Sequence, residues 1–198
     1  MEDKQYVEID PLEKESEILS LFKEYDPKSY GKNDEGFDWI EEEDSKCVVI
    51  SNPYSDNDLE INIGDMNEFT VYFGDAHDHF WAYQEEYEYM LDMIKKILLN
   101  EVCEAELNDA DGKWFGFCYP NKSEIDNDPV ELFDFCFNEK EFSKHLIKSG
   151  YSVSFSFWNP VDNKTITIPA KRGGKKVNEI LFFCLLQSFL IVLSSNNQ

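Results

Sequence analysis

The sequence has little positive charge. Its 198 residues include 18 Lys and Arg against 41 Asp and Glu, which gives a formal net charge of -23 at pH 7. This excess repels the phosphates of nucleic acids and the anionic surface of a membrane, and it attracts basic surfaces over the Debye length. The composition therefore argues against nucleic-acid and membrane partners, and it predicts a basic protein as the partner.

The sequence also lacks the short motifs of common catalytic sites. It contains no GxSxG nucleophile motif, no GxxxxGK(S/T) phosphate-binding loop and no GxGxxG dinucleotide-binding motif. The segment Asp109-Ala110-Asp111-Gly112 is similar to part of a calcium loop. With Gly112 at the sixth position of that loop, however, the first position falls on Leu107, so we predict a turn. These patterns predict no enzyme activity and no cofactor.

A disulfide framework is not indicated either. The five cysteines are odd in number and widely spaced, with no CxxC pair: Cys47, Cys103, Cys118, Cys136 and Cys184. They are predicted to be mostly buried thiols in a reducing compartment. The N-terminal residues MEDKQYVEID have no cationic region before an apolar run, so no signal peptide is expected and the predicted location is cytoplasmic.

One long apolar run is present, near the C-terminus. The basic segment KRGGKK (171–176) precedes ILFFCLLQSFLIVL (180–193). As a helix this run spans roughly 21 Å, short of the roughly 30 Å hydrocarbon core, so we predict that it packs on the protein. A tail anchor is the alternative, because basic residues lie on its N-terminal side, as the positive-inside rule requires. The predicted organisation is a single acidic domain over 1–169, followed by a basic linker and a short hydrophobic terminal segment over 170–198.

Hydrophobic periodicity and turn residues predict an α+β fold. Apolar residues at helical spacing follow the Asp10-Pro11 cap and follow Tyr83, and a broken helix or two short helices are predicted from Asp128 to Ser149. Strands are predicted where apolar and polar residues alternate between turns, over 47–51, 59–63, 69–73, 102–107, 113–119, 151–157 and 165–168. We predict a mostly antiparallel sheet of about seven strands, in a meander and hairpins, with three to four helices packed on it.

A cluster of metal-ligand residue types lies between a predicted strand and the next predicted helix. Asp75, His77 and His79 are the candidate ligands of a metal-dependent hydrolase. A closed metal site needs about four ligands and a catalytic one about three, and the sequence lacks the second Asp-His pair of the metallo-β-lactamase HxHxDH motif. The hydrolase is therefore the alternative. In the preferred interpretation no metal is bound, Asp75 or Asp78 caps the helix, and the histidines pack beside Trp81.

Two stretches, over 34–44 and 75–88, combine acidic side chains with aromatic anchors. Acidic charges speed the encounter with a basic protein, and aromatic rings supply much of the binding energy at interfaces. Solubility alone needs a net charge of only about 2 to 8 in magnitude on a small domain, so solubility does not explain the excess. The predicted partner-binding residues are Asp34, Glu35, Asp38, Trp39, Glu41, Glu42, Asp75, His77, Asp78, His79, Trp81, Tyr83, Glu85 and Glu86.

Three runs carry a resemblance to known proteins: EFTVYFGDAHDHF (68–80), YQEEYEYMLDMIKKIL (83–98) and VSFSFWNP (153–160). They resemble small acidic cytosolic proteins of low-GC bacteria, some of which are similar to immunity proteins of polymorphic toxin systems. The resemblance covers residues 59–168 and implies a protein that neutralises a toxin by binding it. The predicted function is an acidic protein-binding module, an immunity protein for a basic toxin or effector domain such as a nuclease. A tail-anchored adaptor is a further alternative.

Deletion of residues 177–198 tests the prediction for the terminal segment. If the segment packs on the protein, its removal exposes an apolar face, so we expect aggregation or a lower melting temperature. Thermal unfolding followed together with light scattering measures both effects. An unchanged melting temperature with improved solubility, and pelleting of the full-length protein with membranes through a high-salt wash, would instead identify an anchor.

Overall fold

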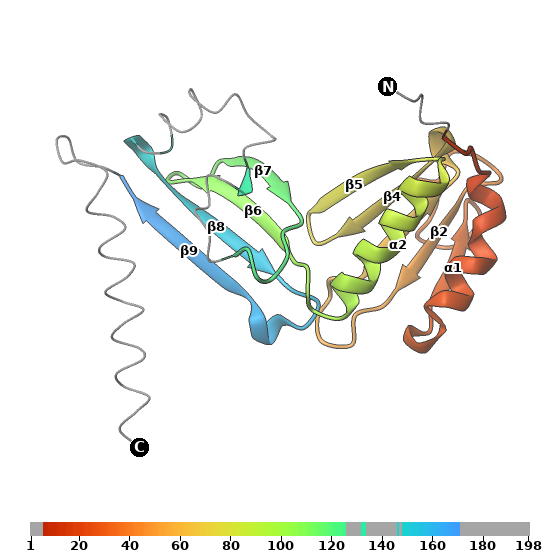
Figure 1. The fold of residues 1–198 in the computed structure, drawn as a ribbon, viewed down its shortest axis with the longest axis horizontal. Helices are drawn as coiled ribbons and strands as arrows, with labels where there is room; N and C mark the ends of the chain where they lie inside the picture. The colour runs from red at the N-terminus through yellow and green to blue at the C-terminus, as the bar shows by residue number, and fades with distance from the viewer. Residues whose placement is uncertain (1–5, 126–131, 134–145, 147, 171–198) are drawn as a thin grey trace, which may run out of the picture.

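The structure is a computed structural model that describes residues 6–125, 132–133, 146 and 148–170 (Figure 1). The strands form two antiparallel sheets, one of five strands in the order β1-β2-β3-β4-β5 and one of four in the order β7-β6-β8-β9. Figure 1 shows the sheets side by side, with α1 and α2 over one face of the first. The elements are η1 (Pro11–Lys14), α1 (Glu15–Leu21), η2 (Lys23–Tyr25), β1 (Lys28–Gly31), β2 (Lys46–Ile50), β3 (Leu59–Ile63), η3 (Asp65–Asn67), β4 (Glu68–Phe73), β5 (Ala76–Trp81), α2 (Gln84–Leu98), β6 (Glu104–Asp109), β7 (Trp114–Cys118), β8 (Gly150–Ser156), η5 (Pro160–Asp162) and β9 (Lys164–Pro169).

The predicted single sheet of about seven strands under three to four helices is wrong. The described residues contain nine strands in two sheets and two α-helices, α1 and α2. Most of the helical segment predicted over 128–149, and all of 171–198, lie outside the described residues. Strands β1 and β5 are missing from the prediction, and β5 is missing because polar residues fill its centre. Within the described ranges, no helix is long and apolar enough to cross a membrane.

The first sheet buries one face against both helices. Phe69, Val71 and Phe73 alternate along β4 and share one apolar cluster with Met90 and Ile94 of α2. All five side chains are 0% exposed. The predicted three-strand meander and the predicted amphipathic helix are therefore confirmed, and the register of the sheet is fixed by this buried face.

The N-terminal helical region begins at the predicted cap. Asp10 Oδ1 accepts a hydrogen bond from the Leu12 backbone N–H at 2.9 Å, and Pro11 takes the first helical position. Ile18 then buries its side chain in the core of the first sheet. The region ends at Asp26, whose φ of 51° is left-handed and stops the helical hydrogen-bond pattern.

The second sheet is built from two hairpins around a central pair of strands. β6 pairs with β7 on one side and with β8 on the other, and β9 pairs with β8. Val153 and Phe155 of β8 are buried with Leu107 of β6 in a separate apolar cluster. The β6–β7 turn contains Gly112 at φ 80°, a conformation that favours glycine. Both predicted hairpins, 102–119 and 151–168, are confirmed.

Trp158 lies two residues after the end of β8, a strand of the second sheet, and yet it is buried in the core of the first sheet. It is 2% exposed, and its ring centroid lies 6.1 Å from that of Phe73. The Asn52 side chain donates a hydrogen bond from Nδ2 to the Trp158 carbonyl oxygen at 2.9 Å. Burial of a large apolar side chain stabilises a fold by roughly 3 kcal/mol, so this residue fastens one sheet to the other.

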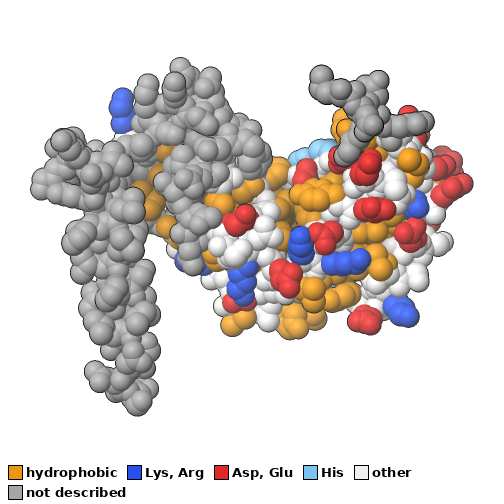
Figure 2. Space-filling model, viewed as in Figure 1, with side chains coloured by type: hydrophobic (Ala, Val, Ile, Leu, Met, Phe, Trp, Pro, Cys, Tyr) orange, Lys and Arg blue, Asp and Glu red, His pale blue; other side chains and the backbone are white. Residues whose placement is uncertain are grey.

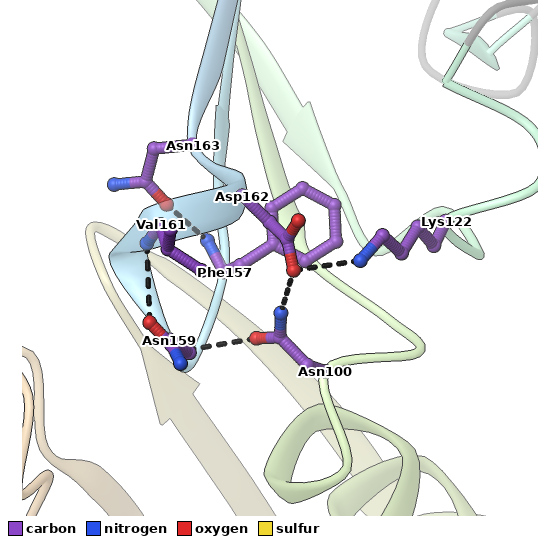
Figure 3. A network of polar contacts seen from close by, with 7 residues as sticks. All are labelled: Asn100, Lys122, Phe157, Asn159, Val161, Asp162 and Asn163. Atoms are coloured by element: carbon purple, nitrogen blue, oxygen red, sulfur yellow. Dashed lines mark hydrogen bonds and ion pairs between the residues drawn. The ribbon is translucent and has the colours of Figure 1, made fainter.

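A polar network surrounds this joint (Figure 3). Asn100 follows α2 and points toward the β8–β9 connection, where its Oδ1 accepts a hydrogen bond from the Asn159 backbone N–H at 2.8 Å. Its Nδ2 donates to the Asp162 carboxylate, which also lies 2.6 Å from Lys122 Nζ. The network therefore ties the end of α2 to the β8–β9 connection and to the segment after β7.

A buried carboxylate makes a third contact between the sheets. Glu104 of β6 is 4% exposed, and its Oε1 accepts a hydrogen bond from the Asp75 backbone N–H in the β4–β5 turn at 2.9 Å. Gly74 permits this approach, because a Cβ at that position would overlap Glu104 Oε2. Burial raises the pKa of the Glu104 carboxyl to about 7, although the Asp75 N–H acts in the opposite direction.

Replacing Asn100 with Gly tests the polar network. Glycine tolerates the φ of 64° at this position, so the change removes the two side-chain hydrogen bonds without adding backbone strain. We expect the free energy of unfolding in urea to fall by about 1–2 kcal/mol, since two part-buried hydrogen bonds are lost, although Asp162 keeps its ion pair with Lys122. Asn67→Gly is the matched control, because Asn67 has φ 58° in the exposed β3–β4 turn. Equal losses in the two variants would contradict a role for the network.

The Glu104 contact predicts a pH-dependent stability. Because its folded-state pKa of about 7 lies above the ordinary 4.5, the stabilisation is complete below about pH 4.5 and is lost as the pH rises through 7. The full change is on the order of 3 kcal/mol, since one pKa unit corresponds to about 1.4 kcal/mol. Glu104→Gln stays neutral, so its free energy of unfolding relative to the parent protein should rise between about pH 5 and pH 8. A difference that does not vary with pH would contradict the buried, raised carboxyl.

Candidate functional site

Many of the predicted partner-binding residues lie at one end of the first sheet, which we call the acidic end. The strand register defines this end, because Lys46 pairs with Gly31 and with Ile63, and Trp81 pairs with Glu68. The acidic end comprises the β1–β2 loop, the β3–β4 turn, Trp81 and the first turn of α2. The acidic end therefore brings together the acidic stretch 34–44 and the second half of the acidic stretch 75–88.

Three large apolar side chains are exposed at the acidic end. Trp39, Met66 and Trp81 are 48%, 82% and 61% exposed, respectively. The β1–β2 loop holds Trp39 in place, because the next residue, Ile40, is only 4% exposed. Phe37 also anchors the loop by stacking on a tyrosine of β1, with ring centroids 4.2 Å apart. The loop therefore presents an exposed tryptophan from a fixed base.

Acidic side chains lie on the same segments as Trp39 and Trp81 or directly after them. The loop exposes Asp34, Glu35, Asp38, Glu41 and Glu42, and α2 begins with the exposed Glu85 and the half-buried Glu86. One cation of the loop is already engaged, since Lys32 Nζ lies 3.4 Å from a Glu43 carboxylate oxygen. Figure 2 shows acidic side chains spread over the half of the molecule that contains the first sheet and its helices. The acidic end therefore combines negative potential with exposed aromatic area.

A small cavity of about 240 Å³ opens beside Trp39. Asn62 contributes to its wall, is 9% exposed, and has an Oδ1 atom with no hydrogen-bond partner among the described residues. A buried acceptor without a donor destabilises a protein by about 1–3 kcal/mol. A donor group that enters the cavity would find this amide together with two carboxylates, because the lining also includes Glu41, Glu42, Lys46 and Met66.

The candidate metal ligands are divided between a turn and a strand. Asp75 lies in the β4–β5 turn, whereas His77 and His79 lie on β5 and face away from α2. Asp78 faces the opposite side, because it pairs with the buried Val71. In the part of the chain that the structure describes, no group of three or more His, Cys, Asp or Glu side chains could hold a metal ion. The geometry therefore gives the hydrolase alternative no support.

His79 is fixed by a carboxylate on the neighbouring strand. Its Nδ1 lies 2.7 Å from Glu68 Oε1 and 3.2 Å from Thr70 Oγ1. Because a carboxylate only accepts hydrogen bonds, the proton lies on Nδ1. The His79 side chain is 52% exposed, whereas that of Glu68 is 11% exposed. The ring is therefore held in one orientation on the sheet face that also carries Trp81.

The expected capping of α2 by Asp75 or Asp78 is wrong. Tyr83 occupies the N-cap position, and no side chain caps this helix. The Tyr83 ring instead contacts Tyr6, with centroids 5.3 Å apart. Glu85 and Glu86 in the first turn of α2 complement the helix dipole. Neither carboxylate is used as a cap, so both remain available to a binding partner.

The buried cysteines are poor nucleophiles. Burial raises the pKa of the Cys47 thiol to about 12, and the nearby Glu60 carboxylate acts in the same direction. Burial also raises the pKa of the Cys103 thiol to about 12. Both groups therefore remain protonated at neutral pH, and cysteine chemistry at these two positions is disfavoured.

A larger cavity of about 530 Å³ lies where β5, α2 and β7 meet, and we call it the junction cleft. Of the predicted residues only His77 and Asp78 line it. The other lining residues could not be predicted, because they come from three segments that are far apart in the sequence. Their charge or aromatic character is the only signal of a site in the sequence. The charged and aromatic side chains of the lining include Asp78, Tyr89, Lys96, Phe117, Tyr119 and Glu124.

Comparisons of the chain with models of protein families, with curated proteins and with solved structures found no match. The resemblance to immunity proteins therefore stays a prediction.

Proposed function

We propose that the chain is an acidic protein-binding module, an immunity protein that neutralises a basic toxin or effector domain, such as a nuclease, by binding it directly. The observation that carries the proposal is the presence of Trp39, Met66 and Trp81, all exposed, among the carboxylates of the acidic end. The cytoplasmic location predicted from the sequence belongs to the same proposal, because an immunity protein acts where its producer must be protected.

Charge and aromatic area have separate effects in such a complex. A nuclease holds phosphates in a cationic cleft, so a surface rich in carboxylates complements it and raises the association rate. Trp39 and Trp81 then supply the large, rigid contact area that dominates affinity at interface centres. A protein that occupies the cationic cleft in this way excludes the nucleic acid and neutralises the enzyme.

The acidic end is also preorganised for binding. It is supported by a sheet whose central residues Val48, Ile61 and Val71 are 0% exposed. The β1–β2 loop is fastened by Ile40, and the Gly31 backbone N–H donates to Asp34 Oδ2 at 2.7 Å. Less conformational entropy is then lost on association, which raises affinity for a given contact area.

A binding and neutralisation assay tests the proposal. The probe is the product of the gene immediately upstream, which the proposal expects to contain a basic toxin domain, tested by biolayer interferometry and by the catalytic assay of that domain. We expect inhibition with one-to-one binding, an association rate that falls steeply as NaCl is raised, and a dissociation rate that changes less. A salt-independent association rate, or binding without inhibition, would refute the proposal.

Matched variants locate the binding face. The double variant Trp39→Ala/Trp81→Ala should raise the dissociation constant by roughly 1,000-fold, since each hot-spot aromatic contributes on the order of 2 kcal/mol. Trp114→Ala is the control, because Trp114 is 52% exposed but lies on β7 of the second sheet. An equal loss in the control variant would place the interface elsewhere.

A further inference from the structure

The junction cleft has aromatic and acidic walls that belong to different sheets. The first sheet and its helix supply Asp78 and Tyr89, while β7 and the segment after it supply Phe117, Tyr119 and Glu124. The volume of about 530 Å³ falls within the roughly 300 to 1,000 Å³ of small-molecule sites, which occur preferentially between structural units. The size and position of the cleft therefore suit a small ligand.

The charges of the cleft favour a cation. Asp92 and Lys96 neutralise one another, with Oδ2 and Nζ 2.6 Å apart. Neither Asp78 nor Glu124 forms an ion pair with a described lysine or arginine. Hydrogen bonds from Asn121 lower the pKa of the Glu124 carboxyl, so it is ionised, and burial raises the pKa of Asp78, which a bound cation would counteract.

The uncharged walls of the cleft favour an organic body on that cation. Tyr89 is 62% exposed, and the Phe117 ring centroid lies 5.5 Å from that of His77 on β5. The apolar side chains of Met93 and Val102 also line the cleft. Aromatic faces attract ammonium groups and pack on methylene chains, whereas a hydrated inorganic ion gains little from them.

We propose that the junction cleft binds a linear aliphatic diamine or polyamine. One ammonium group lies beside Asp78 and another beside Glu124, so the ligand bridges the two sheets, and its methylene chain packs against Tyr89, Phe117 and Tyr119. The two carboxylates stand on different walls, and a flexible linear chain with a charge at each end matches that arrangement. No residue that lines the cleft belongs to the acidic end, so the assignment of this ligand does not rest on the proposed partner.

Isothermal titration calorimetry of the full chain with putrescine (1,4-diaminobutane) and with spermidine tests the proposal at constant ionic strength. We expect one-to-one binding that Asp78→Asn weakens about tenfold, since the change removes one nearby charge and keeps the side-chain shape. Tyr89→Ala should weaken binding about threefold, the size of one partly exposed cation–π contact. Circular dichroism confirms that each variant is folded.

The controls separate the cleft from the general acidity of the chain. Asp111→Asn removes a charge from the exposed β6–β7 turn, and Tyr54→Ala removes a ring that is 58% exposed outside the cleft. Neither variant should change the affinity, and neutral 1,4-butanediol should not bind. Equal weakening by Asp111→Asn, or displacement of putrescine by Mg²⁺ at equal ionic strength, would overturn the proposal. Binding of a lysine-rich peptide without any binding of putrescine would overturn it in favour of a peptide ligand.

Discussion

The burial of Trp158 fixes how the two sheets are placed. This residue leaves the second sheet at the end of β8 and completes the apolar core between the first sheet and α2. Because the indole cannot move without opening that core, the β8–β9 connection stays beside the end of α2, where Asn100 can reach Asn159 and Asp162. Burial of a large side chain contributes roughly 3 kcal/mol, whereas one hydrogen bond contributes about 1 kcal/mol net. Burial of Trp158 is therefore the larger stabilising effect, and it places the groups that form the polar network.

The junction cleft is a consequence of this joint. Figure 1 shows the sheets meeting near the end of α2, with β5 and β7 as the facing edge strands. Glu104 holds the β4–β5 turn to β6, and His77 contacts Phe117 across the junction, with ring centroids 5.5 Å apart. These contacts hold two sides of the cleft in place, and the cavity between them is open to a ligand. A cavity whose walls are held apart by separate contacts keeps its shape without a ligand, which favours binding of a small molecule.

Local patterns predicted the elements of this chain better than its architecture. The cap at Asp10 and the apolar spacing along α2 act within a few residues, so both helices were predictable. Strand β5 was not, because it is an edge strand in which only Ala76 and Phe80 are buried, and its polar residues imitate a loop. The strands divide into two sheets because Trp158, which follows β8, is buried in the core of the other sheet. The alternation of apolar and polar residues along one strand does not show which other strands or which core that strand will contact. Trp39 was predicted as a partner-binding residue from its acidic surroundings, but the sequence does not show that the adjacent Ile40 is the residue that anchors the loop by burial.

Helix α2 connects the two surfaces that carry the proposals. Its first turn belongs to the acidic end, Tyr89 and Lys96 line the junction cleft, and its last turn reaches Asn100 in the joint. Glu85 in its first turn lies four residues before Tyr89, which is about 6 Å along the helix axis, so the acidic end and the cleft are neighbours on this helix. Charges this close interact even at physiological salt, because the Debye length is about 8 Å. Movement of the helix as a rigid body would instead have to displace Met90 and Ile94 from a core in which both are 0% exposed. Occupancy of the cleft and binding at the acidic end are therefore expected to be coupled through charge and not to be energetically additive.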